Sequence, residues 1–427
     1  MAADGQSFAL SYSAPRRGRP PPRQRHGWLD SSKRIAKNIY NARECYNIMI
    51  NKVEAVAIAH KGFETVCESE IVELIKAKKC VVGDTTVLFE AKDTKEIAEL
   101  CYKAQSVSRI ILVISKFEHN GKKGNEFLEL LKDSINAADF GAWLKDRTFR
   151  VNCEHTIELE ATSVDIAEQA GEYIIDKTKA KAKMNDPDII VFVYVNDKTC
   201  FVGIDFSGFD LSKRDYKIYV MASSMNGALA YSFIRAAGFK KDSVLLDPFC
   251  GSGIIPIEAA LYSSGKSPNF YRKDKFAFHK FMKIDLDKFD NEKKEIEAQI
   301  FGSDFILSAV KATRNNAKIA GIEKTLNMTK IEVEWLDTKY DEKFFDFIVT
   351  QPPIDSKQTD VKQIEKAHKE LFNHAEYILK DKGRLAVIMQ KTDIFRRCMY
   401  NFEITEEYSV WQGKQELTVM VLKKSKK

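Results

Sequence analysis

The stretch Val244-Leu245-Leu246-Asp247-Pro248-Phe249-Cys250-Gly251-Ser252-Gly253 is a short apolar, strand-forming run that ends in a glycine loop. An apolar segment, Ile254 to Leu261, follows at once and is predicted to be a helix. Glycines let a backbone approach a ligand closely, and a helix N-terminus adds N–H donors and partial positive charge. The sequence predicts a ligand-binding loop made by Asp247, Pro248, Phe249, Gly251, Ser252 and Gly253. Two glycines alone also fit a plain β-to-α turn.

A second strand, Asp346 to Thr350, ends in Gln351-Pro352-Pro353. Paired prolines fix two φ angles and remove two N–H groups, so this loop is rigid and presents acceptors without donors. The carbonyl of Pro352 and the side-chain oxygen of Gln351 can hold the hydrogens of an exocyclic nucleobase amine in a near-attack arrangement. If the two strands are neighbours in a parallel sheet, both loops face one pocket. As a bare dipeptide, Pro-Pro is more often only a turn.

Two acidic residues follow other predicted strands of the same region. Asp304 follows the strand at 299–303, where a carboxylate can accept both hydroxyls of a ribose; the alternative is a helix cap. Asp337 follows the strand predicted at 331–335, where it can accept a hydrogen bond from the amine of adenine; the alternative is a surface turn.

The C-terminal half of the chain alternates between strands and helices, which is typical of a doubly wound α/β sheet. The predicted strands are 243–247, 299–303, 331–335, 346–350, 384–389 and 416–422. An aromatic, lysine-rich stretch, 264–294, interrupts the alternation. It is either a substrate-contacting insertion or a packed connection between elements.

The N-terminal half divides into a flexible-looking extension and two smaller α/β units. Strands at 54–58, 86–90 and 110–114 with helices at 64–78 and 94–104 indicate a ferredoxin-like layer. The second unit has helices at 126–137 and 164–182, the latter with Ser163 as N-cap, a strand at 148–153 and a hairpin of 189–195 with 199–205. The predicted domains are 1–48, 49–118, 119–212 and 213–427.

Composition restricts the class of protein. The 427 residues suffice for two or three domains, and a net charge of +6 permits a nucleic-acid partner without requiring one. Eight scattered cysteines and seven histidines form no metal-binding pattern, so we expect reduced thiols in a cytoplasmic protein without a metal. No apolar run approaches the ~20 residues of a membrane helix. The Pro/Arg-rich 14–25 is either a nucleic-acid-binding arm or an extension outside the core.

In these motifs the chain resembles the THUMP-containing RNA guanine-N2-methyltransferases. In the catalytic part the likeness rests on Arg214-Asp215-Tyr216-Lys217, the glycine loop, Ser303-Asp304, Asn315-Asn316-Ala317 and the paired-proline loop. In the middle part it rests on 147–151, Thr162-Ser163, 185–188 and 202–205. The resemblance implies ferredoxin-like and THUMP domains followed by a Rossmann-like class I methyltransferase domain. It also implies S-adenosylmethionine as methyl donor and structured RNA, most often tRNA, as substrate.

The resemblance assigns expected roles to residues of this chain. The glycine-loop residues, Asp304 and Asp337 would hold the cofactor, and Gln351, Pro352 and Pro353 would form the catalytic loop. Lys177, Lys181 and Arg214 would contact RNA; for the lysines the alternative is a solvated helix face. The loop departs from the family, which usually has Asn or Asp before the prolines and an aromatic and Gly after them; here these are Gln351, Ile354 and Asp355. Two alternatives stay open: a ribosomal RNA substrate, or an RNA-binding protein with an inactive methyltransferase fold.

Overall fold

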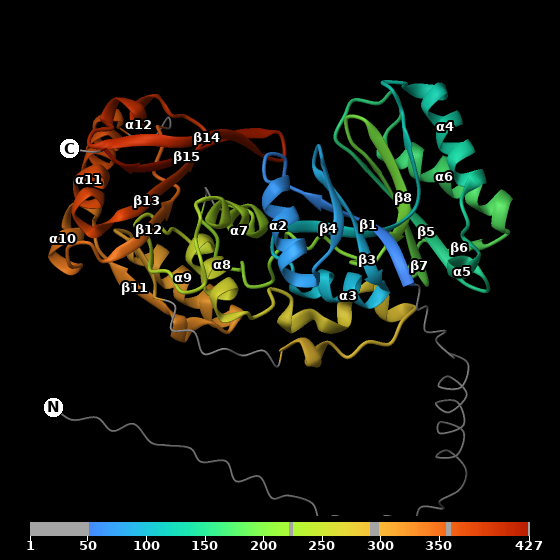
Figure 1. Ribbon diagram of the computed structural model, residues 1–427, viewed down its shortest axis with the longest axis horizontal. Helices are drawn as coiled ribbons and strands as arrows, with labels where there is room; N and C mark the ends of the chain where they lie inside the picture. The colour runs from blue at the N-terminus through green and yellow to red at the C-terminus, as the bar shows by residue number, and fades with distance from the viewer. Residues whose placement is uncertain (1–50, 222–224, 291–298, 356–359, 426–427) are drawn as a thin grey trace, which may run out of the picture. The chain divides into compact units, whose positions relative to one another are not determined.

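Two mixed β-sheets organise the part of the chain that this computed structural model describes, residues 51–221, 225–290, 299–355 and 360–425 (Figure 1). The predicted extension 1–48 lies outside the described residues. The order of the first sheet is β2 (Lys78–Gly83), β3 (Thr86–Asp93), β1 (Asn51–Ala59), β4 (Val107–Glu118), β8 (Thr199–Asp205), β7 (Ile189–Val195), β5 (Thr148–His155) and β6 (Lys181–Ala182).

The ferredoxin-like and THUMP segments share this one sheet. Strand β4 pairs antiparallel with β8, with Leu112 opposite Ile204, and so joins the two predicted layers edge to edge. The predicted hairpin is confirmed as β7–β8. The helices in the part of the chain that forms the first sheet are α2 (Glu64–Ile75), α3 (Thr94–Lys103), α4 (Gly124–Ala137), α5 (Gly141–Leu144) and α6 (Ser163–Thr178).

Helix α6 differs from the prediction at both its N-terminal and its C-terminal boundary. Thr162, not Ser163, is its N-cap, because Thr162 and Asp165 form a capping box. The helix ends at Thr178 instead of 182, since Lys179 adopts a left-handed conformation with φ of 58°. Lys181 then enters β6.

The second sheet is doubly wound, as predicted. Its order is β11 (Leu326–Lys330), β10 (Ile300–Asp304), β9 (Leu245–Asp247), β12 (Phe345–Thr350), β13 (Leu379–Met389), β15 (Gln415–Lys424) and β14 (Phe402–Gln412). Pairing is parallel from β11 to β13 and antiparallel for β15 and β14. The strand order reverses between β9 and β12, and ligands bind at such a switch point.

Neighbouring residues of β9 enter cores on opposite faces of this sheet, as the two-residue period of a strand requires. Leu245 packs in the core with α7 (Gly227–Ala236) and α8 (Ile254–Ser264), and Leu246 packs in the core with α11 (Val361–Ile378). The strand predicted at 331–335 is wrong: β11 ends at Lys330, and Val333–Trp335 is a 3-10 turn. The remaining helices are α9 (Leu307–Ala320), α10 (Leu336–Lys339) and α12 (Asp393–Cys398).

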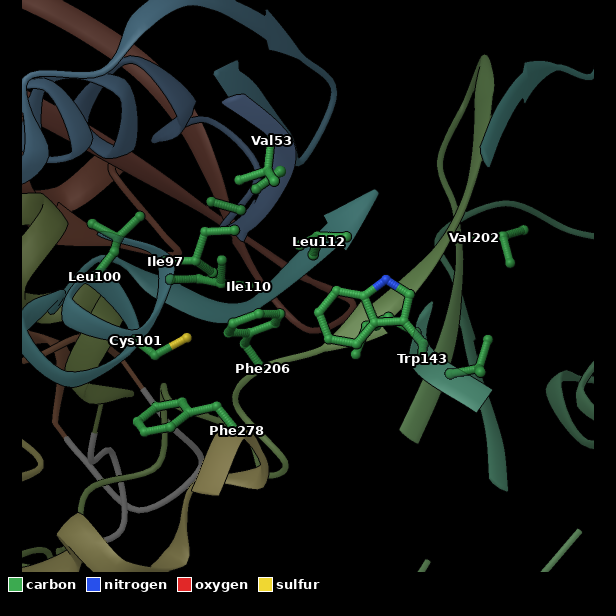
Figure 2. Close-up of a cluster of buried hydrophobic side chains, with 14 of the residues drawn as sticks. Val53, Ile97, Leu100, Cys101, Ile110, Leu112, Trp143, Val202, Phe206 and Phe278 are labelled. Atoms are coloured by element: carbon green, nitrogen blue, oxygen red, sulfur yellow. The ribbon is translucent and has the colours of Figure 1, made fainter. Parts of the chain in front are cut away.

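The aromatic stretch after α8 is mainly a packed connection, although Tyr271 is exposed. Phe278 and Phe281 are buried in the core of the first sheet, and Phe281 contacts the rings of Trp143 and Phe206 edge-on. Figure 2 shows Phe278 beside Cys101 and Phe206 in this cluster. The connection from the second sheet therefore completes the core of the first. Its residues 291–298 lie outside the described ranges.

Candidate active site

The two loops singled out in the sequence lie at the same edge of the second sheet. Strands β9 and β12 pair in parallel, with Phe347 opposite Leu245, so both strands end side by side. The glycine loop and Gln351 line one pocket, whose described lining is Met221, Met225, Asp247, Phe249, Cys250, Gly251, Ser252, Ile254, Ile255 and Gln351. The predicted juxtaposition of the two loops is thus found.

The surroundings of the two glycines of the loop differ in the space that they leave for a side chain. Both have positive φ, 52° at Gly251 and 82° at Gly253. A Cβ on Gly253 would lie 2.2 Å from Cγ2 of Thr313, so close packing against α9 excludes a side chain there. A Cβ on Gly251 would meet nothing within 4 Å. Gly251 therefore borders open space, as a cradle for a ligand requires.

Side chains of α9 hold the loop from behind. The hydroxyl of Thr313 donates to the carbonyl of Gly251 at 2.9 Å, and the amide of Asn316 donates to the carbonyl of Ser252 at 2.9 Å. Asn316 lies in the Asn315-Asn316-Ala317 motif, so the structure gives that motif a physical role. The loop is fixed before any ligand binds.

Asp304 faces the glycine loop from the end of β10. Its Oδ2 accepts the N–H of Gly251 at 3.0 Å and its Oδ1 accepts the N–H of Ile306 at 2.9 Å. Burial raises the pKa of its carboxyl above the ordinary value, and these two backbone N–H groups oppose that rise. Helix α9 has Ile306 at its N-cap without a side-chain bond, so Asp304 is not a helix cap. Each carboxylate oxygen keeps acceptor capacity for a ribose hydroxyl.

Asp247 is a buried carboxyl between the two loops. Its Oδ1 accepts a hydrogen bond from the hydroxyl of Thr350 at 2.6 Å and from the N–H of Phe249 at 3.2 Å. Burial raises the pKa of Asp247 to about 7, because desolvation outweighs these two hydrogen bonds. A cationic ligand group beside this carboxyl would favour its charged form.

The paired-proline loop is held by groups that the sequence did not indicate. Nε2 of His368, on α11, lies 2.9 Å from the carbonyl oxygen of Pro353. Nζ of Lys391 donates to Oδ2 of Asp355 at 2.7 Å, and Ile354 packs against the neighbouring core. The residues that depart from the family loop, Ile354 and Asp355, thus anchor it here. Gln351 is half-buried at the pocket.

Comparison with known proteins agrees with this geometry. Residues 214–420 match the RMKL-like, methyltransferase domain family, and residues 126–205 match the THUMP domain family. The chain thus combines a THUMP domain with an RMKL-like methyltransferase domain. Among relatives, the tRNA (guanine(6)-N2)-methyltransferase of Methanocaldococcus jannaschii is 29% identical over 82% of this chain and 95% of its own length.

Two further comparisons bear on substrate and fold. Ribosomal RNA large subunit methyltransferase K/L of Buchnera aphidicola is 26% identical over 68% of this chain and 43% of its own length. The crystal structure of SMU.472 complexed with SAH superposes with a TM-score of 0.73 at 21% identity, covering 88% of this chain and all of that one. This last likeness shows the shared fold.

The structure does not bring Asp337 to the pocket of this methyltransferase. The residue lies in α10, because the preceding strand ends earlier than predicted, and its Oδ1 is 3.5 Å from Nδ1 of His374. Phe305, directly after Asp304, is 58% exposed, and the sequence analysis did not single it out. An aromatic that follows a strand-end acid is the signal that would have indicated it.

Two of the three predicted RNA contacts have other partners. The guanidinium of Arg214 is fully buried and forms an ion pair with Glu258, with Nε 2.7 Å from Oε1. It also donates to the carbonyl of Gln105 at 2.7 Å and so ties the catalytic part to the first sheet. Lys177 donates to carbonyls at the end of α4, among them that of Ile135 at 3.0 Å. Lys181 is exposed, and its role stays a prediction.

A larger groove opens on the THUMP part of this methyltransferase. It has a volume of about 750 Å³ between β5 and α6 and is lined by Arg109, Arg150, Phe149, Phe192 and Met184 among others. The Nε of Arg150 is buried without a hydrogen-bond partner among the described residues. Within those residues no cluster fits a metal ion, and no helix is long and apolar enough to cross a membrane.

Proposed function

We propose that this protein transfers a methyl group from S-adenosylmethionine to the exocyclic N2 of a guanosine in tRNA. The observation that carries the proposal is one pocket lined by both Gly251 and Gln351. The open side of Gly251 fits a cofactor, and the acceptor-rich proline loop fits an amine. The named tRNA guanine-N2 methyltransferase among the relatives supports the choice of substrate.

Different residues of the chain would hold the cofactor and the target base. S-adenosylmethionine, when bound, supplies a sulfonium methyl group and becomes S-adenosylhomocysteine once the amine nitrogen has taken the methyl and released one proton to water. Asp304 would accept the ribose hydroxyls, and Asp247 would face the cationic end. Gln351 Oε1 and the carbonyl of Pro352 would accept the two amine hydrogens and turn the nitrogen lone pair toward the methyl group.

The RNA would be held outside this pocket. The THUMP groove offers Arg150 for a phosphate, because Arg109 is already paired with the buried Asp205 and the rings of Phe149 and Phe192 are each 1% exposed. Its glutamates, Glu154, Glu168 and Glu172, restrict where a phosphate can lie. The target base would leave its helix to reach Gln351. A cytoplasmic location belongs to the same proposal, supported by the seven free cysteines of the described chain.

One experiment tests the proposal. Unmodified tRNA and ribosomal RNA are each incubated with the protein and isotope-labelled S-adenosylmethionine, digested to nucleosides and analysed by mass spectrometry. Labelled N2-methylguanosine from tRNA supports the proposal. Label in ribosomal RNA alone would move the substrate to that class. RNA binding without incorporation into either RNA would identify an inactive methyltransferase fold.

A further inference from the structure

The paired-proline loop has an unusual need for outside support. Pro352 and Pro353 have no N–H, so at these two positions the backbone can be tied to the protein only through carbonyl oxygens that accept from other donors. The carbonyl of Pro353 lies one residue from that of Pro352, the proposed acceptor for the target amine. A group that holds the carbonyl of Pro353 therefore also fixes the position of the carbonyl of Pro352.

We propose that His368 is a positioning residue for methyl transfer, whose imidazole N–H fixes the paired-proline loop so that Gln351 and Pro352 face the target amine. This inference rests on the proposed function. It adds a group on α11 that does not belong to the described lining of the pocket.

The hydrogen bond determines the tautomer of His368. The carbonyl of Pro353 can only accept, so Nε2 of His368, at 2.9 Å, carries the proton. Nδ1 is then a bare acceptor, and it is buried without a hydrogen-bond partner among the described residues. Burial also lowers the pKa of this imidazole, in keeping with a neutral ring.

Packing prevents the ring from turning to another partner. His368 is 1% exposed, and its ring meets that of Phe395 on α12 edge-on, at 5.3 Å and 75°. Lys391 provides a second anchor further along the loop, at Asp355. The loop is thus tied on both sides of Ile354, close to the pocket.

The unpartnered Nδ1 of His368 bears on whether this residue serves stability or the position of the loop. A buried acceptor without a donor destabilises the folded state, and a phenylalanine of similar shape would carry no such group. Phenylalanine would also leave the carbonyl of Pro353 without its donor, so the two effects on stability oppose each other. What histidine adds is the Nε2–H donor at the proline loop.

Kinetics of three variants test the proposal. In H368F we expect kcat to fall at least about tenfold, with the KM for tRNA and the Kd for S-adenosylmethionine within about twofold, because a displaced acceptor acts in the transition state. H368Q, whose amide can replace the donor, should recover most of the lost kcat. H374F is the matched control: His374 is another buried histidine of α11, paired with Asp337 and Glu370, and its loss should leave kcat unchanged.

The melting temperature of each variant is measured as well, because a purely structural role of His368 would lower it together with kcat. H368F should melt close to the wild-type temperature, because losing the bond to Pro353 and removing the unpartnered Nδ1 change stability in opposite directions. A kcat of H368F within about twofold of wild type would overturn the proposal. So would an H368Q variant no more active than H368F, or a loss of kcat accompanied by a lower melting temperature in H368F alone.

A second measurement keeps this inference distinct from the proposed function. Wild-type protein that methylates no RNA would end the proposed function. Long-range ¹H–¹⁵N spectra of histidine-labelled protein at neutral pH, assigned with H368F, should then still show His368 as the neutral Nε2–H tautomer. An Nδ1–H tautomer or a cationic ring would overturn the anchoring of the loop.

Discussion

The hydroxyl of Thr350 donates a hydrogen bond of 2.6 Å to Oδ1 of Asp247. Thr350 is the last residue of β12 and Asp247 is the last residue of β9. Both side chains are buried, so this bond fixes the ends of the two strands against each other where water does not compete. The glycine loop and the proline loop start from these two residues.

The T350V variant tests this link. Valine keeps the shape of threonine but removes a donor from a buried carboxyl, so we expect a loss of about 1–3 kcal/mol in the free energy of unfolding. Urea denaturation measures that loss. T338V is the control, because Thr338 is exposed and its hydroxyl bonds only to the nearby carbonyl of Trp335. Equal stability of T350V and T338V would contradict the prediction.

The carboxyl of Asp247 should make stability depend on pH. Its folded pKa of about 7 lies above the ordinary 3.8, so the folded state binds the proton more tightly than the unfolded state. The stability contributed by this proton is present below the ordinary pKa and is lost as pH rises toward 7, by an amount on the order of 4 kcal/mol.

The D247N variant isolates this effect. Asparagine keeps an oxygen acceptor for Thr350 and does not titrate. Without ligand, the free energy of unfolding of D247N minus that of wild type should grow between about pH 4 and about pH 7 and then level off. A difference that stays constant with pH would show that Asp247 ionises normally.

We expect substitutions of Asp304 and Asp337 to have different effects on the affinity for the cofactor. D304A should weaken the affinity for S-adenosylmethionine by at least about tenfold in calorimetry, because two ribose hydroxyls would lose a shared acceptor. D337A should bind normally, since Asp337 lies in α10 beside His374. Unchanged affinity in D304A, or a loss in D337A, would reverse the assignment made from the structure.

Gln351 should act in turnover and not in cofactor binding. Q351A removes one of the two proposed acceptors, so we expect kcat to fall at least about tenfold while the Kd for S-adenosylmethionine changes little. Q351N retains the amide in the position that the family uses and should keep more activity than Q351A. Normal turnover of Q351A in the tRNA assay would remove Gln351 from the mechanism.

The connection after α8 should stabilise the first sheet. F278A leaves a cavity among residues of that core, and we expect a loss of about 3–5 kcal/mol in the free energy of unfolding. Y271A is the matched control from the same connection, because Tyr271 is 62% exposed and its loss should cost less than about 0.5 kcal/mol. Similar losses in both variants would contradict the packing described above.

Local pattern was sufficient for much of the fold. Two strand-forming runs around the turn at Asn196-Asp197 predicted β7 and β8, and glycine and proline geometry predicted both loops of the pocket. Strand β2 was missed because most of its residues are exposed, so no buried face marks the sequence. The strand predicted at 331–335 lies after β11, which ends at Lys330, so Asp337 does not follow a strand as predicted.

The doubly wound sheet, the glycine loop and the donor-free proline loop follow from the order of the residues, because backbone geometry and short-range periodicity depend on residues close together in the chain. The pairing of Arg214 with Glu258, the contact of Lys177 with the end of α4 and the bond of His368 to Pro353 follow only from the folded chain. These partners are far apart in sequence. Whether a charged or polar side chain reaches solvent, a ligand or a buried partner depends on which distant segment packs against it.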